Sequence, residues 1–108
     1  MDEMNPLVPV AMQIIVHAGE ARTRANEALD ALSEKDFETA KAKMEEAHRE
    51  ITLAHQSQTE VIQREAAGEK IDGGVLFSHA QDTLMTVMSE VNLSDRLVQL
   101  FEAFFGQV

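Results

Sequence analysis

The chain has 108 residues, with 19 acidic and 9 basic side chains that give a formal net charge of −10, and its composition favours helices. A surface this acidic repels phosphate backbones and anionic lipids, so we expect no nucleic-acid partner and no insertion into a membrane. The absence of cysteine excludes disulfides, thiolate catalysis and cysteine-ligated zinc. With no apolar run near the roughly 20 residues of a bilayer span, a cytoplasmic protein is expected.

The first predicted helix covers residues 7–32. Its small and apolar residues recur at alternating steps of three and four, as on one buried face of a helix: Ala11, Ile14, Ala18, Ala21, Ala25, Ala28 and Leu32. Because most of them are alanine, we expect a close approach between this helix and its neighbour. The polar residues 33–36 interrupt the pattern, and Asp36 can cap the next helix.

The second predicted helix covers residues 37–67. Its buried face contains Ala40, Met44, Ala47, Ile51, Ala54, Gln58, Val61 and Glu65. The polar members Gln58 and Glu65 make this face more hydrophilic toward the C-terminal end. Gly68 is a natural helix stop, and the residues that follow it, 69–74, are typical of a loop.

The third predicted helix, residues 75–105, has two patterned faces. One contains Phe77, Ala80, Leu84, Val87, Val91, Ser94, Val98, Phe101 and Phe105. The other contains His79, Asp82, Thr86, Ser89, Leu93, Leu97, Leu100 and Phe104. A helix with two such faces needs more partners than the other two helices of one chain supply. We therefore predict one all-α domain over residues 1–108, an antiparallel three-helix bundle that packs against further subunits.

His79 and Asp82 are the candidate functional pair, because a spacing of three places them on one face of the helix, about one turn apart. Ionisable groups are costly in a buried stripe unless something satisfies them. One interpretation is a core histidine that donates a hydrogen bond. The other is a site, since Gln81 and Thr83 are close in sequence and imidazole can take and release a phosphoryl group or a proton near neutral pH.

Asp82 also has two interpretations. It is either an ordinary solvent-facing aspartate or a carboxylate brought near its symmetry mates in an oligomer. Like charges so close must protonate or bind a cation, and a hard, oxygen-liganded ion such as Mg²⁺ fits best. The remaining histidines, His17, His48 and His55, show no zinc-type spacing, so no histidine-ligated metal is predicted.

The sequence resembles the IIA component of the lactose/cellobiose (N,N'-diacetylchitobiose) type in the bacterial sugar phosphotransferase system. The most specific match is His79-Ala80-Gln81-Asp82 with Leu84-Met85-Thr86. The other matching stretches cover most of the chain: Ile14-Ile15, His17 to Arg22, Asp36-Phe37-Glu38, Ala54-His55, Gln58-Thr59 and Ala66 to Lys70.

The resemblance implies a homotrimer in which His79 is the phosphorylated residue. It would accept a phosphoryl group from the carrier protein HPr and pass it to a cysteine of the IIB component, for uptake of a lactose/cellobiose-type disaccharide. It also implies that three Asp82 side chains surround one structural divalent ion per trimer. Gln81 and Thr83 are the candidate donors to the phosphoryl oxygens. Thr83 stands where family members often carry a second histidine, and this keeps open an alternative function as a non-catalytic trimeric adaptor.

Overall fold

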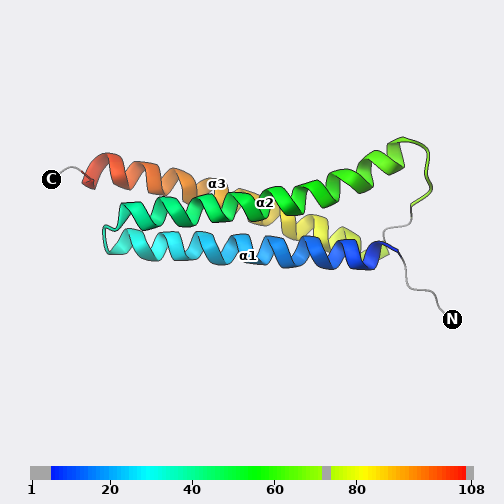
Figure 1. Cartoon of the computed structure of the whole chain (residues 1–108), viewed down its shortest axis with the longest axis horizontal. Helices are drawn as coiled ribbons and strands as arrows, with labels where there is room; N and C mark the ends of the chain where they lie inside the picture. Colours follow the sequence, from blue (N-terminus) through cyan, green and yellow to red (C-terminus); the bar gives the residue numbers. More distant parts are fainter. Residues whose placement is uncertain (1–5, 72–73, 107–108) are drawn as a thin grey trace.

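The structure, a computed structural model, describes residues 6–71 and 74–106, and the regular structure within these ranges is entirely helical. Helix α1 covers Leu7–Ser33, α2 covers Phe37–Ala66 and α3 covers Gly74–Phe105. Each bound lies within one residue of the prediction. The helices form an elongated bundle in which α1 and α3 run in one direction and α2 in the other (Figure 1). The predicted antiparallel three-helix architecture is confirmed.

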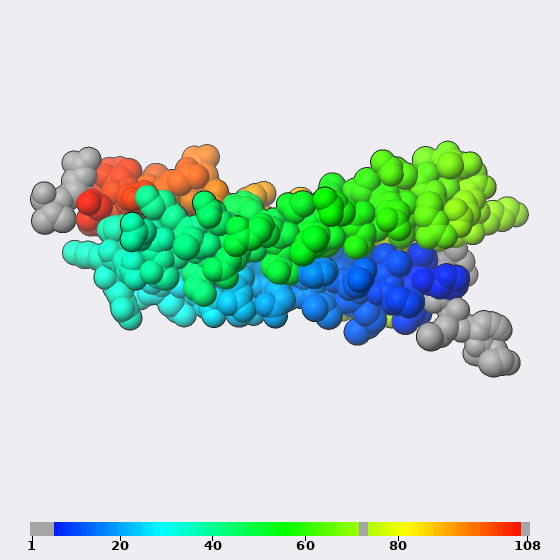
Figure 2. Space-filling view, in the orientation of Figure 1, coloured from blue at the N-terminus to red at the C-terminus, as the bar shows by residue number. Residues whose placement is uncertain are grey.

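Helix α1 is the central element of the bundle. It packs extensively against both other helices, whereas the contact between α2 and α3 is the smallest of the three. In Figure 1, α2 lies beside α1 and diverges from it toward its own C-terminal end, while α3 crosses behind both. Figure 2 shows the face covered by α1 and α2, with α3 in view mainly toward its C-terminal end.

The core follows the predicted faces of α1 and α2 except at Glu65, which was placed on the buried face of α2 and is exposed. Every α1 position named for the buried face is buried, and Leu7 extends this face by one turn. Helix α3 contributes most of the large side chains, with Leu84, Val87, Val91 and Val98 among the largest that are fully buried. Since α1 and α2 contribute mainly alanine, the helices approach closely and the branched side chains of α3 fill the remaining space.

The last turn of α3 departs from the prediction, which placed Phe101 and Phe105 in the buried seam. Both rings are exposed, and they contact each other edge to face with centroids 5.9 Å apart. The Lys41 ammonium pairs with the Glu102 carboxylate at 2.8 Å. Because Lys41 lies near the start of α2, the last residues of α3, from Phe101 onward, lie at the end of the bundle, where few side chains remain to cover them.

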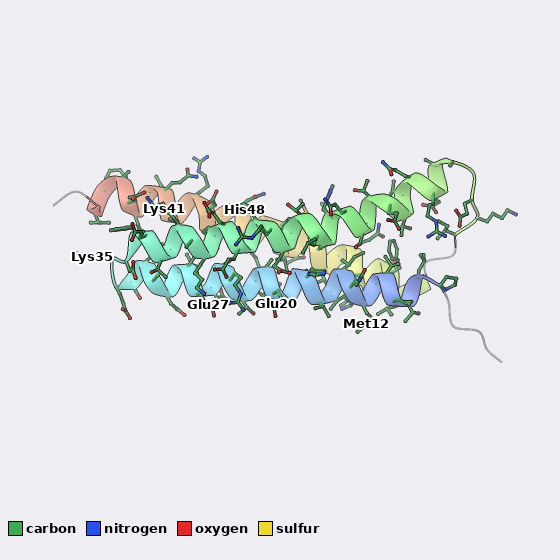
Figure 3. The ribbon with its side chains drawn as sticks, in the orientation of Figure 1. Met12, Glu20, Glu27, Lys35, Lys41 and His48 are labelled. Carbon is green, nitrogen blue, oxygen red and sulfur yellow. The ribbon has the colours of Figure 1, made fainter. Side chains whose placement is uncertain are left out.

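Helices α1 and α2 both end in a residue with positive φ, but the residue is a lysine after α1 and a glycine after α2. After α1, Lys35 adopts the left-handed conformation with φ 58°, and its N–H donates to the Leu32 carbonyl at 2.9 Å. After α2, Gly68 takes the same role with φ 98°, and its N–H donates to the Glu65 carbonyl at 3.0 Å. Glycine adopts this conformation without steric cost, whereas lysine does not. Figure 3 shows Lys35 at the turn between α1 and α2.

Asp36 caps α2 as the sequence predicts. Its carboxylate accepts a hydrogen bond from the Thr39 backbone N–H at 3.1 Å. The Thr39 side chain and backbone amide stabilise the charged form, so the pKa of Asp36 lies below its ordinary value. The cap fixes the start of α2 directly after the turn.

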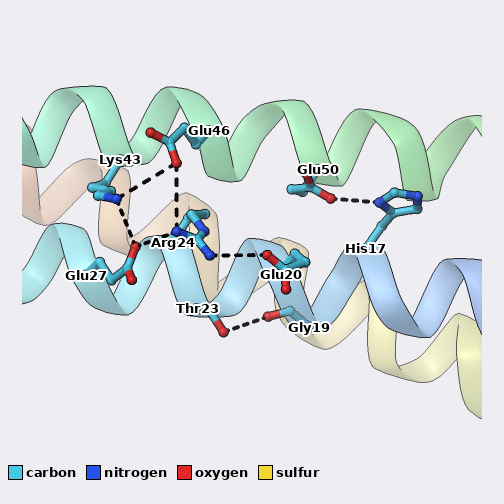
Figure 4. A network of polar contacts seen from close by, with 9 residues as sticks. All are labelled: His17, Gly19, Glu20, Thr23, Arg24, Glu27, Lys43, Glu46 and Glu50. Carbon is cyan, nitrogen blue, oxygen red and sulfur yellow. Dashed lines mark hydrogen bonds and ion pairs between the residues drawn. The ribbon is translucent and has the colours of Figure 1, made fainter.

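A network of charged side chains joins α1 to α2 along one edge (Figure 4). Its members are Glu20, Arg24, Glu27, Lys43 and Glu46. On the same edge His17 Nδ1 lies 2.7 Å from Glu50 Oε1. Between α2 and α3, the His48 ring lies 3.6 Å from the Asp95 carboxylate; His48 and Lys41 are labelled on α2 in Figure 3. Such partly exposed pairs contribute little energy individually.

Candidate functional site

His79 lies in the second turn of α3, and its side chain is exposed. Within the part of the chain that the structure describes, no hydrogen bond or ion pair engages its imidazole. The other three histidines each have a neighbour, which is Glu50 for His17, Asp95 for His48 and Thr59 for His55. The core-histidine interpretation of His79 is therefore wrong, and its role as a functional site stays a prediction.

Two of the three predicted neighbours share the side of α3 on which His79 lies. Asp82 is exposed, and Thr83 is half-buried one turn beyond His79. Residues three and four apart are neighbours on a helix surface, so the Thr83 hydroxyl lies within reach of a group attached to the imidazole. This hydroxyl can donate a hydrogen bond to an oxygen anion.

Gln81 lies elsewhere. Two residues on from His79, it is rotated by about 200° around the helix and so faces the opposite side. Its half-buried side chain lines a pocket of about 200 Å³ together with Ser78 and with Glu65 of α2. The structure thus does not bring Gln81 beside the imidazole of its own chain, and its role as a phosphoryl donor group stays a prediction.

The surroundings of His79 carry few charges. From residue 74 to residue 89 the only charged side chain of α3 is Asp82, and α1 has no charged residue between Leu7 and Gly19. The two segments lie at the same end of the bundle, since α1 and α3 run in parallel (Figure 1). The run of uncharged residues in α1 was the sequence signal for this feature, and the sequence-based prediction of the site did not include it.

The described residues of one chain supply no complete metal site at Asp82. Residues 6–71 and 74–106 contain no group of three side chains that could bind a metal ion. Asp82 itself is exposed and, within these ranges, is in no ion pair. A carboxylate oxygen is the kind of ligand that Mg²⁺ prefers, and several copies of Asp82 brought together would offer this ion a more complete donor set than one copy does.

Comparisons with known proteins identify the family of this chain. The family model described as the PTS system, lactose/cellobiose specific IIA subunit, matches residues 9–102. The chain belongs to this family. It is 40% identical to the lichenan-specific phosphotransferase enzyme IIA component of Bacillus subtilis over 106 residues, covering 98% of this chain and 94% of that protein. It is 36% identical to the N,N'-diacetylchitobiose-specific EIIA component of Escherichia coli K12 over 100 residues, covering 93% and 86%.

The fold of this IIA chain matches those of solved relatives. The crystal structure of the cellobiose-specific enzyme IIA of Bacillus anthracis superimposes with a TM-score of 0.88 at 34% identity, covering 98% of this chain and 97% of that one. The structure of PtcA from S. mutans gives the same TM-score at 36% identity, covering 94% and 99%. None of the helices in the described part of this IIA chain is long and apolar enough to cross a membrane. The IIA chain is thus a phosphotransfer component of a sugar transport system.

Proposed function

We propose that His79 accepts a phosphoryl group from HPr and passes it to a cysteine of the IIB component of a lactose/cellobiose-type system in the cytoplasm. The observation that carries this proposal is the exposed imidazole of His79, unengaged by the described residues and one turn from the Thr83 hydroxyl. Phosphoryl transfer needs an in-line approach to an accessible nucleophile and donors for the phosphoryl oxygens. The surface around His79 satisfies the first requirement, and Thr83 supplies a donor.

Each transfer exchanges one bond to phosphorus for another. In the first step a lone pair of the His79 imidazole forms an N–P bond while the N–P bond of the donor's phosphohistidine breaks. The departing imidazole takes up a proton, and the His79 ring releases one from its other nitrogen. In the second step the IIB thiolate forms an S–P bond as the His79 N–P bond breaks, and His79 regains its proton. The Thr83 hydroxyl donates to a phosphoryl oxygen throughout.

The same proposal includes a homotrimer around the exposed face of α3. This face, here called the outward stripe, consists of His79, Asp82, Thr86, Ser89, Leu93, Leu97, Leu100 and Phe104. All of these except the half-buried Leu97 are exposed in the single chain. Its apolar half would supply the energy of assembly. Its polar half would bring three Asp82 carboxylates together, and a divalent ion such as Mg²⁺ held there would neutralise their mutual repulsion.

Phosphorylation in a reconstituted relay tests the proposal. The chain is incubated with phosphoenolpyruvate, enzyme I and HPr, and its intact mass is measured before and after mild acid treatment. We expect one acid-labile phosphoryl group on the native chain and none on His79→Ala. His55→Ala is the matched control, because His55 is also an exposed histidine. The His55→Ala chain should still gain one phosphoryl group, on His79.

Two results would count against the proposal. A phosphoryl group that persists in His79→Ala would assign the reaction to another residue. An unmodified native chain, with HPr shown to be active on a second acceptor, would favour the alternative of a trimeric adaptor that has lost transfer, with Thr83 in place of a histidine.

A further inference from the structure

A pocket at the end of the bundle has no role in the function described so far. The turn between α1 and α2 and the C-terminal end of α3 lie at the same end of the molecule (Figure 1). Between them is a cavity of about 220 Å³, here called the end pocket. It is lined by Leu32, Ser33, Lys35, Phe37, Phe101 and Phe105. Phe101 lies roughly 33 Å along α3 from His79, so the end pocket is separate from the phosphorylation site.

Three phenylalanine rings form most of the wall of the end pocket. Phe37 is half-buried, while Phe101 and Phe105 remain 42% and 57% exposed in contact with each other. Both residues continue the face of α3 that packs against the other two helices, so the end pocket opens within one chain and not on the outward stripe. An apolar cavity of about 150 Å³ can hold benzene. The end pocket therefore has room for a phenyl ring with a short chain attached.

Lys35 is the one charged residue among the described residues that line the end pocket. Its backbone is left-handed, with φ 58°, a conformation that is strained for a residue with a Cβ. Gly68 occupies the corresponding position after α2, and the end of α1 uses only the backbone N–H of Lys35. The turn itself therefore does not require lysine. Residues held in such strained conformations cluster at ligand-binding and catalytic sites.

The ammonium group of Lys35 is not engaged by the rest of the described chain. Its neighbours in sequence, Glu34 and Asp36, are acidic, yet within residues 6–71 and 74–106 Lys35 is in no ion pair. The Asp36 carboxylate instead accepts a hydrogen bond from the Thr39 N–H. Five other basic residues of α1 and α2 are in ion pairs: Arg22, Arg24, Lys41, Lys43 and Arg64. An exposed cation beside an apolar pocket suits a ligand with an apolar body and one negative charge.

We propose that the end pocket binds a small organic acid. Its apolar body, an aryl ring or a short alkyl chain, lies against Phe101 and Phe105 while its carboxylate pairs with Lys35. The net charge of −10 opposes an anion, but physiological salt screens exposed charges more than about 8 Å apart. The charge in direct contact therefore decides, and it is positive. An apolar amine is the wrong ligand, because its cation would lie beside the Lys35 ammonium.

Two compounds with the same phenylpropyl body test the proposal. They are 4-phenylbutanoate, which is charged, and 4-phenylbutan-1-ol, which is not. Each is titrated into the ¹⁵N-labelled native chain at pH 7 while the backbone amide chemical shifts are followed. We expect saturable shifts centred on residues 33–37 and 101–106. The carboxylate should bind about three- to fivefold more tightly than the alcohol, as expected for a partly exposed ion pair.

Variants of Lys35 test the charge. Lys35→Gln should remove the preference for the carboxylate and leave the affinity for the alcohol within about twofold, because only the ion pair is lost. Lys35→Arg should keep the preference, since it retains the positive charge. Circular dichroism should show unchanged helix content in both variants.

Variants of the two terminal phenylalanines test the apolar wall. Phe105→Ser should weaken the binding of both compounds at least about fivefold, because it removes one wall of the end pocket. Phe104→Ser is the matched control, since Phe104 is an exposed ring of the same helical turn that is not among the lining residues. Because one chain forms the end pocket, the affinity of this control should stay within about twofold of the native value even where assembly is weakened.

Four results would overturn the proposal. If neither compound gives saturable shifts at these residues, the end pocket is not a binding site. If the alcohol binds as tightly as the carboxylate, or Lys35→Gln keeps the preference, the ligand class is wrong. Equal weakening by Phe104→Ser and Phe105→Ser would place the compounds on the exposed end of α3 and outside the end pocket. Shifts at these residues that vary with protein concentration alone would show that a second copy covers the end pocket.

Discussion

Leu93 provides the sharpest test of the outward stripe. In the single chain its side chain is 62% exposed, although it lies in the middle of a helix that is buried on another face. If the stripe is the assembly surface, replacing Leu93 with glutamine should weaken the trimer without harming the fold of the chain. Glutamine has a similar length, and its amide must lose water when it is buried.

The expected loss of trimer stability follows from the exposed fraction of the Leu93 side chain. Full burial of a leucine side chain contributes about 1.5–3 kcal/mol, so burying the exposed 62% contributes about 1–2 kcal/mol per chain. Three equivalent positions lose about 3–6 kcal/mol per trimer. Because the half-dissociation concentration of a trimer varies with the square root of its dissociation constant, Leu93→Gln should raise that concentration about 10- to 100-fold.

Analytical ultracentrifugation over a concentration series measures this shift. Leu53→Gln is the matched control, since Leu53 is a 44% exposed leucine of α2 that is not part of the outward stripe. We expect its half-dissociation concentration to stay within about twofold of the native value, an energy difference of less than about 0.8 kcal/mol per trimer. Equal weakening by both variants, or no weakening by Leu93→Gln, would refute the assignment of the assembly face.

Three further predictions follow from the turns and the stripe. Lys35→Gly should raise the free energy of unfolding by about 1 kcal/mol and Gly68→Ala should lower it by a similar amount, because both positions have positive φ; urea unfolding measures both. Asp36→Ala should lower the melting temperature near neutral pH, where the Asp36 carboxylate is charged in the folded and unfolded states. Because folding lowers the pKa of Asp36, its stabilisation is lost as the pH falls through the folded pKa, so the difference from the native chain should shrink below about pH 4 in a thermal series. Asp82→Leu should give trimers that are more stable and contain no divalent metal by elemental analysis, and weaker trimers would contradict the axial position of Asp82.

The fold was predictable because three local signals agree. The alternating steps of three and four predicted most of the buried face of each helix, with Glu65 of α2 an exception that is exposed. Asp36 and Gly68 marked boundaries within one residue of those observed. The error at Phe101 and Phe105 has a geometric cause. Periodicity assigns a residue to a face of its helix, but only the relative lengths of the helices decide whether a neighbour reaches that face.

The site was predictable only in part. The spacing of His79, Asp82 and Thr83 correctly placed them on neighbouring faces of one turn. Gln81 was grouped with them by closeness in sequence, although a step of two residues points to the opposite side of a helix. The pairing of Arg22 with Glu90, across most of the chain, depends on how α1 and α3 pack and has no local signal.

The most direct measurement of the central claim follows the phosphoryl group through the relay. The phosphorylated chain is separated from HPr, the modified residue is located by fragment mass spectrometry, and the chain is then mixed with its IIB component. We predict that the group resides on His79 and that IIB gains, on its cysteine, the same amount that the chain loses. A group found on His17, His48 or His55, or one that stays on the chain in the presence of an active IIB protein, would contradict the account.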